Sequence, residues 1–174
     1  MSQRQAGPYP SVVPTRSELE QGAMAGMAAT GAMSVLMLGA RRLGLIDRQP
    51  PEEITQHVTD RTGAFVRGVP LRIAASLAHL AFGAIGGIVF ASLLRLTGHV
   101  ASPVRLAVTY GLSIWFVSYR HALPAWGLVR SDREAGVTRD VVMLVAHVVY
   151  GLVLGGLLRP GGRAGVPRHG RRRA

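Results

Sequence analysis

The sequence contains neither cysteine nor lysine among its 174 residues. The absence of cysteine excludes disulfides, iron–sulfur clusters, thiolate zinc sites and cysteine nucleophiles. The absence of lysine means that all 20 basic residues are arginines, whose charge is permanent, so lysine Schiff-base chemistry is excluded as well. The chain also lacks a phosphate-binding glycine loop and a serine in a nucleophile elbow. We therefore expect a non-enzymatic protein.

Charge is scarce in four long stretches, although 17% of all residues are charged. The stretches cover residues 22–40, 73–94, 106–123 and 141–158, and their length and apolar character predict membrane-spanning helices. The third is the least regular, because only residues 106–119, about 21 Å of helix, precede Arg120. We predict an all-α integral membrane domain over residues 22–158, a four-helix bundle in contact with the lipid bilayer.

The segments around these stretches are polar. Residues 1–21 are predicted to form a disordered arm, and residues 159–174 a disordered arginine-rich tail. In the first connection, the run Pro50-Pro51-Glu52-Glu53 is a helix start signal and Gly63 a stop signal. This pattern predicts a short amphipathic helix on the membrane surface.

The net charge of +11 raises the question of a nucleic-acid partner. No aromatic-basic interleaving or DNA-binding motif accompanies the charge, and arginines commonly flank membrane spans, so no nucleic-acid partner is expected. Four spans place ten arginines on each side, which leaves the orientation undecided. Seven of the nine acidic residues lie in the two connections opposite the termini, and the run Arg171–Arg173 lies at the end of the chain. We expect cytoplasmic termini.

A short motif occurs twice, 68 positions apart. His79-Leu-Ala-Phe-Gly-Ala-Ile-Gly-Gly87 and His147-Val-Val-Tyr-Gly-Leu-Val-Leu-Gly-Gly156 both fit His-x-x-[Phe/Tyr]-Gly-x-[Ile/Val]-x-Gly. The repeat predicts a duplicated two-span hairpin, with its halves related by a pseudo-two-fold axis along the membrane normal. Spans 73–94 and 141–158 are then expected to face each other. Small-residue pairs four positions apart are expected to seat neighbouring helices, namely Gly83 with Gly87 and Gly151 with Gly155.

Histidine inside a membrane span has three interpretations here. The simplest is that His79 and His147 are neutral hydrogen-bond donors between helices of a structural or binding module. The second is a small carrier or channel whose midplane site uses both histidines with Tyr150 and Arg120. The third is a bis-histidine site for haem b in a redox protein.

No cofactor is predicted, and the histidine spacing gives no metal site. The methionines of residues 22–40 are interpreted as packing groups rather than copper ligands. The position of Arg120, buried or reaching to the headgroups, stays open. A homo-oligomer is an expected assembly, because four short helices enclose little volume.

Several short motifs lie between residues 22 and 158. They are Gly22-Ala-Met-Ala-Gly-Met-Ala-Ala-Thr30, Pro50-Pro51-x-x-Ile54-Thr55, Tyr110-Gly111 with Trp115, Tyr119 and Pro124, and His147-x-x-Tyr150-Gly151. Together they resemble those of uncharacterised small bacterial inner-membrane proteins, broadly the YagU-like class of domains of unknown function. The resemblance implies a multi-span protein of the bacterial inner membrane and brings no established activity.

Overall fold

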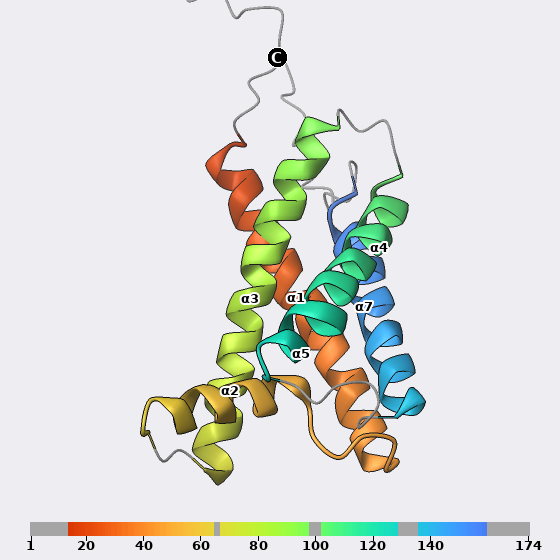
Figure 1. The fold of residues 1–174 in the computed structure, drawn as a ribbon. Helices are drawn as coiled ribbons and strands as arrows, with labels where there is room; N and C mark the ends of the chain where they lie inside the picture. The colour runs from red at the N-terminus through yellow and green to blue at the C-terminus, as the bar shows by residue number, and fades with distance from the viewer. Residues whose placement is uncertain (1–13, 65–66, 98–101, 129–135, 160–174) are drawn as a thin grey trace, which may run out of the picture.

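The computed structural model describes residues 14–64, 67–97, 102–128 and 136–159, and within these ranges it is all-helical (Figure 1). Three helices are long and apolar enough to cross a membrane: α1, α3 and α7. The protein therefore has the helices of a membrane protein. The elements in chain order are α1 (Arg16–Arg42), α2 (Pro50–Arg61), α3 (Gly68–Leu96), α4 (Pro103–Ile114), the π-helix η1 (Trp115–Ala122), α5 (Leu123–Ala125) and α7 (Val137–Leu157).

The first helix begins earlier than the sequence suggests. A capping box at Thr15 starts α1, with the Thr15 hydroxyl accepting from the Glu18 amide and the Glu18 carboxylate accepting from the Thr15 amide at 2.7 Å. The expectation of a disordered arm over residues 1–21 is thus wrong for residues 16–21. Residues 1–13, and residues 160–174 of the predicted tail, lie outside the described ranges.

The third predicted span is made of three consecutive elements. α4, η1 and α5 follow one another without a break from Pro103 to Ala125, so residues 106–123 are helical throughout. Within η1, the wider π-helical turn lets the His121 ring interact with the Phe116 carbonyl five residues earlier, at 2.7 Å. The helix ends at Ala125, one residue after Pro124.

The long helices pack in the order α3, α1, α7, α4 (Figure 1). α1 packs against α3 and α7, and α4 packs against α7, whereas the backbones of α3 and α7 are hardly in contact. The expectation that spans 73–94 and 141–158 pack on each other is therefore wrong for their backbones, since both pack on α1, although the Tyr150 side chain of α7 reaches Gly86 of α3. α3 and α4 meet mainly through side chains, with the Tyr110 hydroxyl donating to the Gly86 carbonyl at 3.0 Å and the Phe90 and Tyr110 rings 5.4 Å apart.

Glycines allow the closest helix contacts. A Cβ atom on Gly26 of α1 would overlap the carbonyl oxygen of Gly83 on α3, and one on Gly22 would lie 2.7 Å from that of Gly87. In the second pair of helices, a Cβ on Gly151 of α7 would lie 2.5 Å from a Cα atom of α4. These helices approach so closely that their backbones touch, as small-residue pairs allow.

α2 forms where the proline and glycine signals predicted it, and it lies across the end of the bundle (Figure 1). Ion pairs attach it to the long helices. Glu53 makes a two-pronged contact with Arg139 of α7, at 2.6 and 3.1 Å, and Glu52 accepts from Arg41 of α1 at 3.2 Å. The Glu53–Arg139 pair is largely buried, with side chains 13% and 8% exposed. It joins the first connection directly to the last helix.

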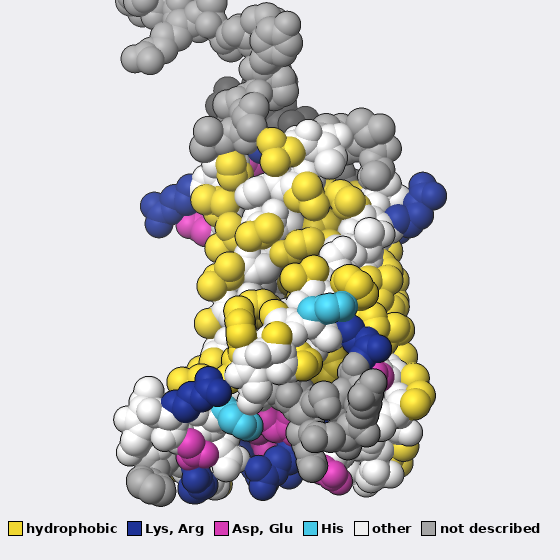
Figure 2. All heavy atoms as spheres, viewed as in Figure 1, with side chains coloured by type: hydrophobic (Ala, Val, Ile, Leu, Met, Phe, Trp, Pro, Cys, Tyr) yellow, Lys and Arg dark blue, Asp and Glu magenta, His cyan; other side chains and the backbone are white. Residues whose placement is uncertain are grey.

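Figure 2 shows hydrophobic side chains over the middle of one face and charged side chains toward its two ends. Large apolar side chains such as Leu77, Ile85 and Val89 of α3 are 50–62% exposed. This distribution is compatible with contact with a lipid bilayer, whose core accepts apolar side chains and excludes charge.

We expect Gly26→Ala to destabilise the protein by about 1–3 kcal/mol, because its methyl group meets backbone that cannot move aside. Gly39→Ala is the matched control in the same helix. Nothing lies within 4 Å of the Cβ that it adds, so its stability should stay the same or rise by up to about 1 kcal/mol. Thermal unfolding in mild detergent measures both variants. Equal stability would contradict the close packing of α1 on α3.

We expect Glu53→Ala to destabilise the protein by about 3–5 kcal/mol, because it leaves the buried Arg139 guanidinium without its carboxylate. The control is Glu20→Ala, which removes the exposed Arg16–Glu20 pair and should cost about 0–1 kcal/mol. The melting temperatures of the two variants are compared in the same detergent. A small, equal loss in both would mean that α2 is held by apolar contacts alone.

Candidate functional site

Both repeat histidines line one small cavity inside the bundle, of about 30 Å³. Its wall comes from all four of the packed helical segments, α1, α3, α4 and α7. The volume matches one water molecule or a single ion. The lining residues are Thr30, Met33, His79, Phe82, Gly83, Ile114, His147 and Tyr150.

His147 is held by its own helix. It is 9% exposed, and its Nδ1 atom lies 2.7 Å from the Met143 carbonyl oxygen, one turn earlier in α7. A carbonyl oxygen can only accept, so Nδ1 carries the hydrogen, and in the neutral ring the lone pair is on Nε2. The ring therefore brings an acceptor atom to the cavity wall.

His79 is held from the neighbouring helix. Its Nδ1 atom lies 3.2 Å from the Ser34 hydroxyl of α1, and its ring is half-buried. The Ser34 hydroxyl can accept, in which case His79 takes the same tautomer as His147. Both rings line the same cavity. The fold thus brings together two residues that lie on helices whose backbones are hardly in contact.

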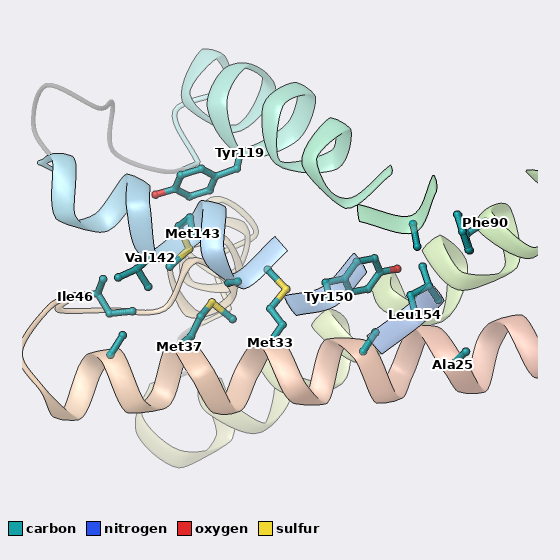
Figure 3. Packing of buried hydrophobic residues seen from close by; sticks show 14 of the residues in the cluster. Ala25, Met33, Met37, Ile46, Phe90, Tyr119, Val142, Met143, Tyr150 and Leu154 are labelled. Carbon is teal, nitrogen blue, oxygen red and sulfur yellow. The ribbon is translucent and has the colours of Figure 1, made fainter. Parts of the chain in front are cut away.

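Tyr150 lines the same cavity, and its hydroxyl is an unsatisfied donor. The residue is 5% exposed, and its hydroxyl is buried without a hydrogen-bond partner among the described residues. The hydroxyl reaches α3, where a Cβ on Gly86 would lie 2.8 Å from it. Figure 3 shows Tyr150 on α7 and Met33 reaching from α1 toward α7. A buried hydroxyl without a partner costs free energy, so a group that satisfies it would gain that energy on binding.

Arg120 is not part of this cavity. Its guanidinium lies 3.8 Å from an Asp140 carboxylate oxygen, and its side chain is 37% exposed. It belongs to the charged cluster near α2, where the buried Tyr119 phenol contacts Arg139. The four glycines proposed for packing lie at helix contacts, although Gly83 also lines the cavity.

Sequence reasoning did not single out the other wall residues of the site. Thr30, Met33 and Ile114 come from helices outside the repeated motif. Thr30 and Met33 are three residues apart, so a shared helix face was their only local signal. Within the motif, Phe82 takes the place of Tyr150 in the other copy and lines the same cavity. The aromatic residue at this position of the motif was the one sequence signal that could have identified Phe82 as a wall residue.

The cavity does not fit a haem in this conformation. Both imidazoles are present, as bis-histidine ligation requires. However, the haem macrocycle is many times larger than about 30 Å³. To admit it, α1 and α3 would have to lose their close backbone contact at Gly83. The helices around the histidines would have to move apart before a haem could enter.

A model of a family of unknown function (DUF6789) matches residues 17–161. The match starts with the second residue of α1 and ends just after α7, so it covers every helix described above. Comparison with curated proteins and with solved structures finds no match.

Proposed function

We propose that this chain, which belongs to the family of unknown function (DUF6789), is a four-span membrane module with a small polar binding site between its two repeat histidines. The proposal places a duplicated hairpin in the bacterial inner membrane, with both termini in the cytoplasm. It has two parts, the membrane architecture and the site.

The run from α4 to α5 supports a fourth span. It starts beside the C-terminal ends of α3 and α7, and it ends near α2 at the other end of the bundle. There the Arg61 guanidinium of α2 donates to the Trp126 carbonyl at 3.3 Å. Because residues 103–125 connect the two ends without a break, they have the reach of a span.

Equivalent glycines support the duplication. Gly83 and Gly87 pack on the preceding long helix, α1, and Gly151 and Gly155, each 68 positions later, pack on the preceding long helix, α4. The same motif position thus makes the same kind of contact in both halves. A pseudo-two-fold axis relates the contact of α1 with α7 to that of α3 with α4. The first is close and the second is loose, so any symmetry is approximate.

The observation that carries the binding site is the cavity that His79, His147 and Tyr150 line together, beside a buried Tyr150 hydroxyl that has no partner among the described residues. If these groups served packing alone, we would expect them to satisfy one another. Instead the Tyr150 hydroxyl, which lies against Gly86, keeps an unpaired hydrogen, and His147 keeps a free acceptor. This pair of groups suits a small occupant that accepts a hydrogen bond from Tyr150 and donates one to His147, or an ion that binds the His147 lone pair.

A small carrier is the second candidate. Ile114 lines the cavity as the last residue of α4, immediately before the π-helix η1. Single π-helical turns often mark functional segments, and a change of register there would move the cavity wall. Solute flux into liposomes that depends on His147 would favour this candidate over a static module. Haem binding is the third candidate and requires the larger rearrangement described above.

The lack of cysteine in the chain makes the topology directly testable with single cysteines. We expect Ser17→Cys and Thr97→Cys to react with a membrane-impermeant maleimide from one side, and Thr62→Cys and Leu128→Cys from the other. Labelling of intact cells and of inverted vesicles identifies the sides. Labelling of Leu128→Cys together with Thr97→Cys would contradict a span from α4 to α5.

We expect Tyr150→Phe to raise the stability of the purified protein by about 1–3 kcal/mol, because it removes a buried hydroxyl without a partner. The matched control, Tyr119→Phe, should lower stability, since the Tyr119 phenol contacts the Arg139 guanidinium. Thermal unfolding of both variants distinguishes a binding group from a packing group. A loss of stability in Tyr150→Phe would mean that the hydroxyl serves the fold, and the proposed site would fail.

A further inference from the structure

The cavity wall combines two imidazoles with one thioether and contains no carboxylate. His79, His147 and Met33 all line it, and Met33 is 6% exposed. The thioether sets Met33 apart from the neighbouring Met37, which is 1% exposed but does not line the cavity. The volume of about 30 Å³ suits an ion better than an organic molecule.

Each histidine is oriented as a metal-binding histidine usually is. In such sites one ring nitrogen binds the metal, and the other is hydrogen-bonded to a carbonyl, a carboxylate or a water, which fixes the ring and its tautomer. His147 has its Nδ1 atom on the Met143 carbonyl at 2.7 Å, and His79 has its Nδ1 atom on the Ser34 hydroxyl at 3.2 Å. Neither Nε2 atom has a hydrogen bond to any described residue. The lone pair of His147 Nε2 is therefore available, and that of His79 Nε2 is available when the Ser34 hydroxyl accepts from Nδ1.

We infer that the cavity is a site for a soft monovalent metal ion, Cu(I), with the Nε2 atoms of His79 and His147 and the sulfur of Met33 as its ligands. Thioethers and imidazoles are ligands that suit Cu(I). The inference rests on the proposed binding site and names its occupant. It departs from the sequence-based expectation of no metal site, which considered the methionines and the histidines separately.

Charge favours a monovalent ion over a divalent one. All three proposed ligands are neutral, and the residues of the cavity wall carry no acidic group. Zn²⁺ would leave two positive charges uncompensated inside an apolar bundle, whereas Cu(I) leaves one. Zinc sites usually draw on cysteine, carboxylates or a third histidine, and the described residues contain no group of three such ligands.

The test measures Cu(I) affinity of the full chain, carrying a tag without histidine, in lipid nanodiscs under anaerobic reducing conditions. Competition with a chromophoric Cu(I) chelator gives the affinity and the number of ions bound. We expect one ion per chain. Loss of a residue that only hydrogen-bonds a metal ligand typically lowers metal affinity by about 10- to 100-fold. His79→Ala and His147→Ala remove the ligands themselves, so each should lower the Cu(I) affinity by at least this factor.

Matched variants separate ligands from bystanders. Met33→Leu should weaken binding while Met37→Leu leaves it unchanged, since both remove a buried thioether but only Met33 lines the cavity. His57→Ala, which removes an exposed imidazole of α2, should also leave binding unchanged. Ser34→Ala keeps every ligand and removes only the partner of His79, so it tests the site even if a ligand variant fails to fold.

X-ray absorption of the loaded wild type should show one sulfur and two nitrogen neighbours. Equal Cu(I) binding in the wild type and all ligand variants, or no binding at all, would overturn the inference. Tighter binding of Zn²⁺ at the same residues would overturn it as well. The proposed polar site fails separately, because its test is the stability of Tyr150→Phe without any metal. A stabilised Tyr150→Phe with no Cu(I) binding would leave that site in place with another occupant.

Discussion

The backbone contact between α1 and α3 at Gly26 and Gly83 sets the geometry of the rest of the molecule. Because neither residue has a side chain, the two helices meet at their main chains, and a Cβ on Gly83 would overlap the Thr30 side chain one turn further along α1. In a membrane, where lipid competes equally well for apolar side chains, such close contact is what holds helices together. It brings Thr30 and Met33 of α1 into the cavity wall beside His79.

The cavity exists because the two pairs of helices, α1 with α3 and α4 with α7, are each joined by close backbone contacts at glycines, whereas the contact between the two pairs is not close on both sides. Gly151 and Gly155 of α7 press on α4 as Gly83 and Gly87 of α3 press on α1. Between the pairs, α1 packs closely on α7, but α3 and α4 are joined mainly through the long side chain of Tyr110. Side chains rather than backbones fill the loose side, and a space of about 30 Å³ remains between them. A fully symmetric bundle would have closed it.

The sequence predicted where the helices lie in the chain better than it predicted which helices pack against each other. Lack of charge and helix start and stop signals located the four apolar helical stretches to within about six residues, because they depend on local chemistry, and three of these helices are long and apolar enough to cross a membrane. The repeat drew attention to His79, His147 and Tyr150, which line one cavity. A small-residue face shows that some helix comes close, but not which one, and so the sequence did not identify α1 as the partner of Gly83. Ile114 gave no local signal and Thr30 only a helix face shared with Met33, since threonine and isoleucine are common in any apolar helix. The π-helix at Trp115–Ala122 also has no sequence signature that we used.

The placement of charged residues explains why the polar groups in the middle of the bundle are all neutral. Every carboxylate of the described residues lies near an end of the bundle, and the pairs Glu18–Arg95 and Glu53–Arg139 show how arginines compensate them there. Carrying a charge further inward would cost several kcal/mol or more without a partner. The groups left to make a polar site in the middle are therefore neutral: imidazole, phenol, hydroxyl and thioether. Such groups would suit a weakly charged or neutral occupant, and this limits what the proposed site could hold more strictly than its volume does.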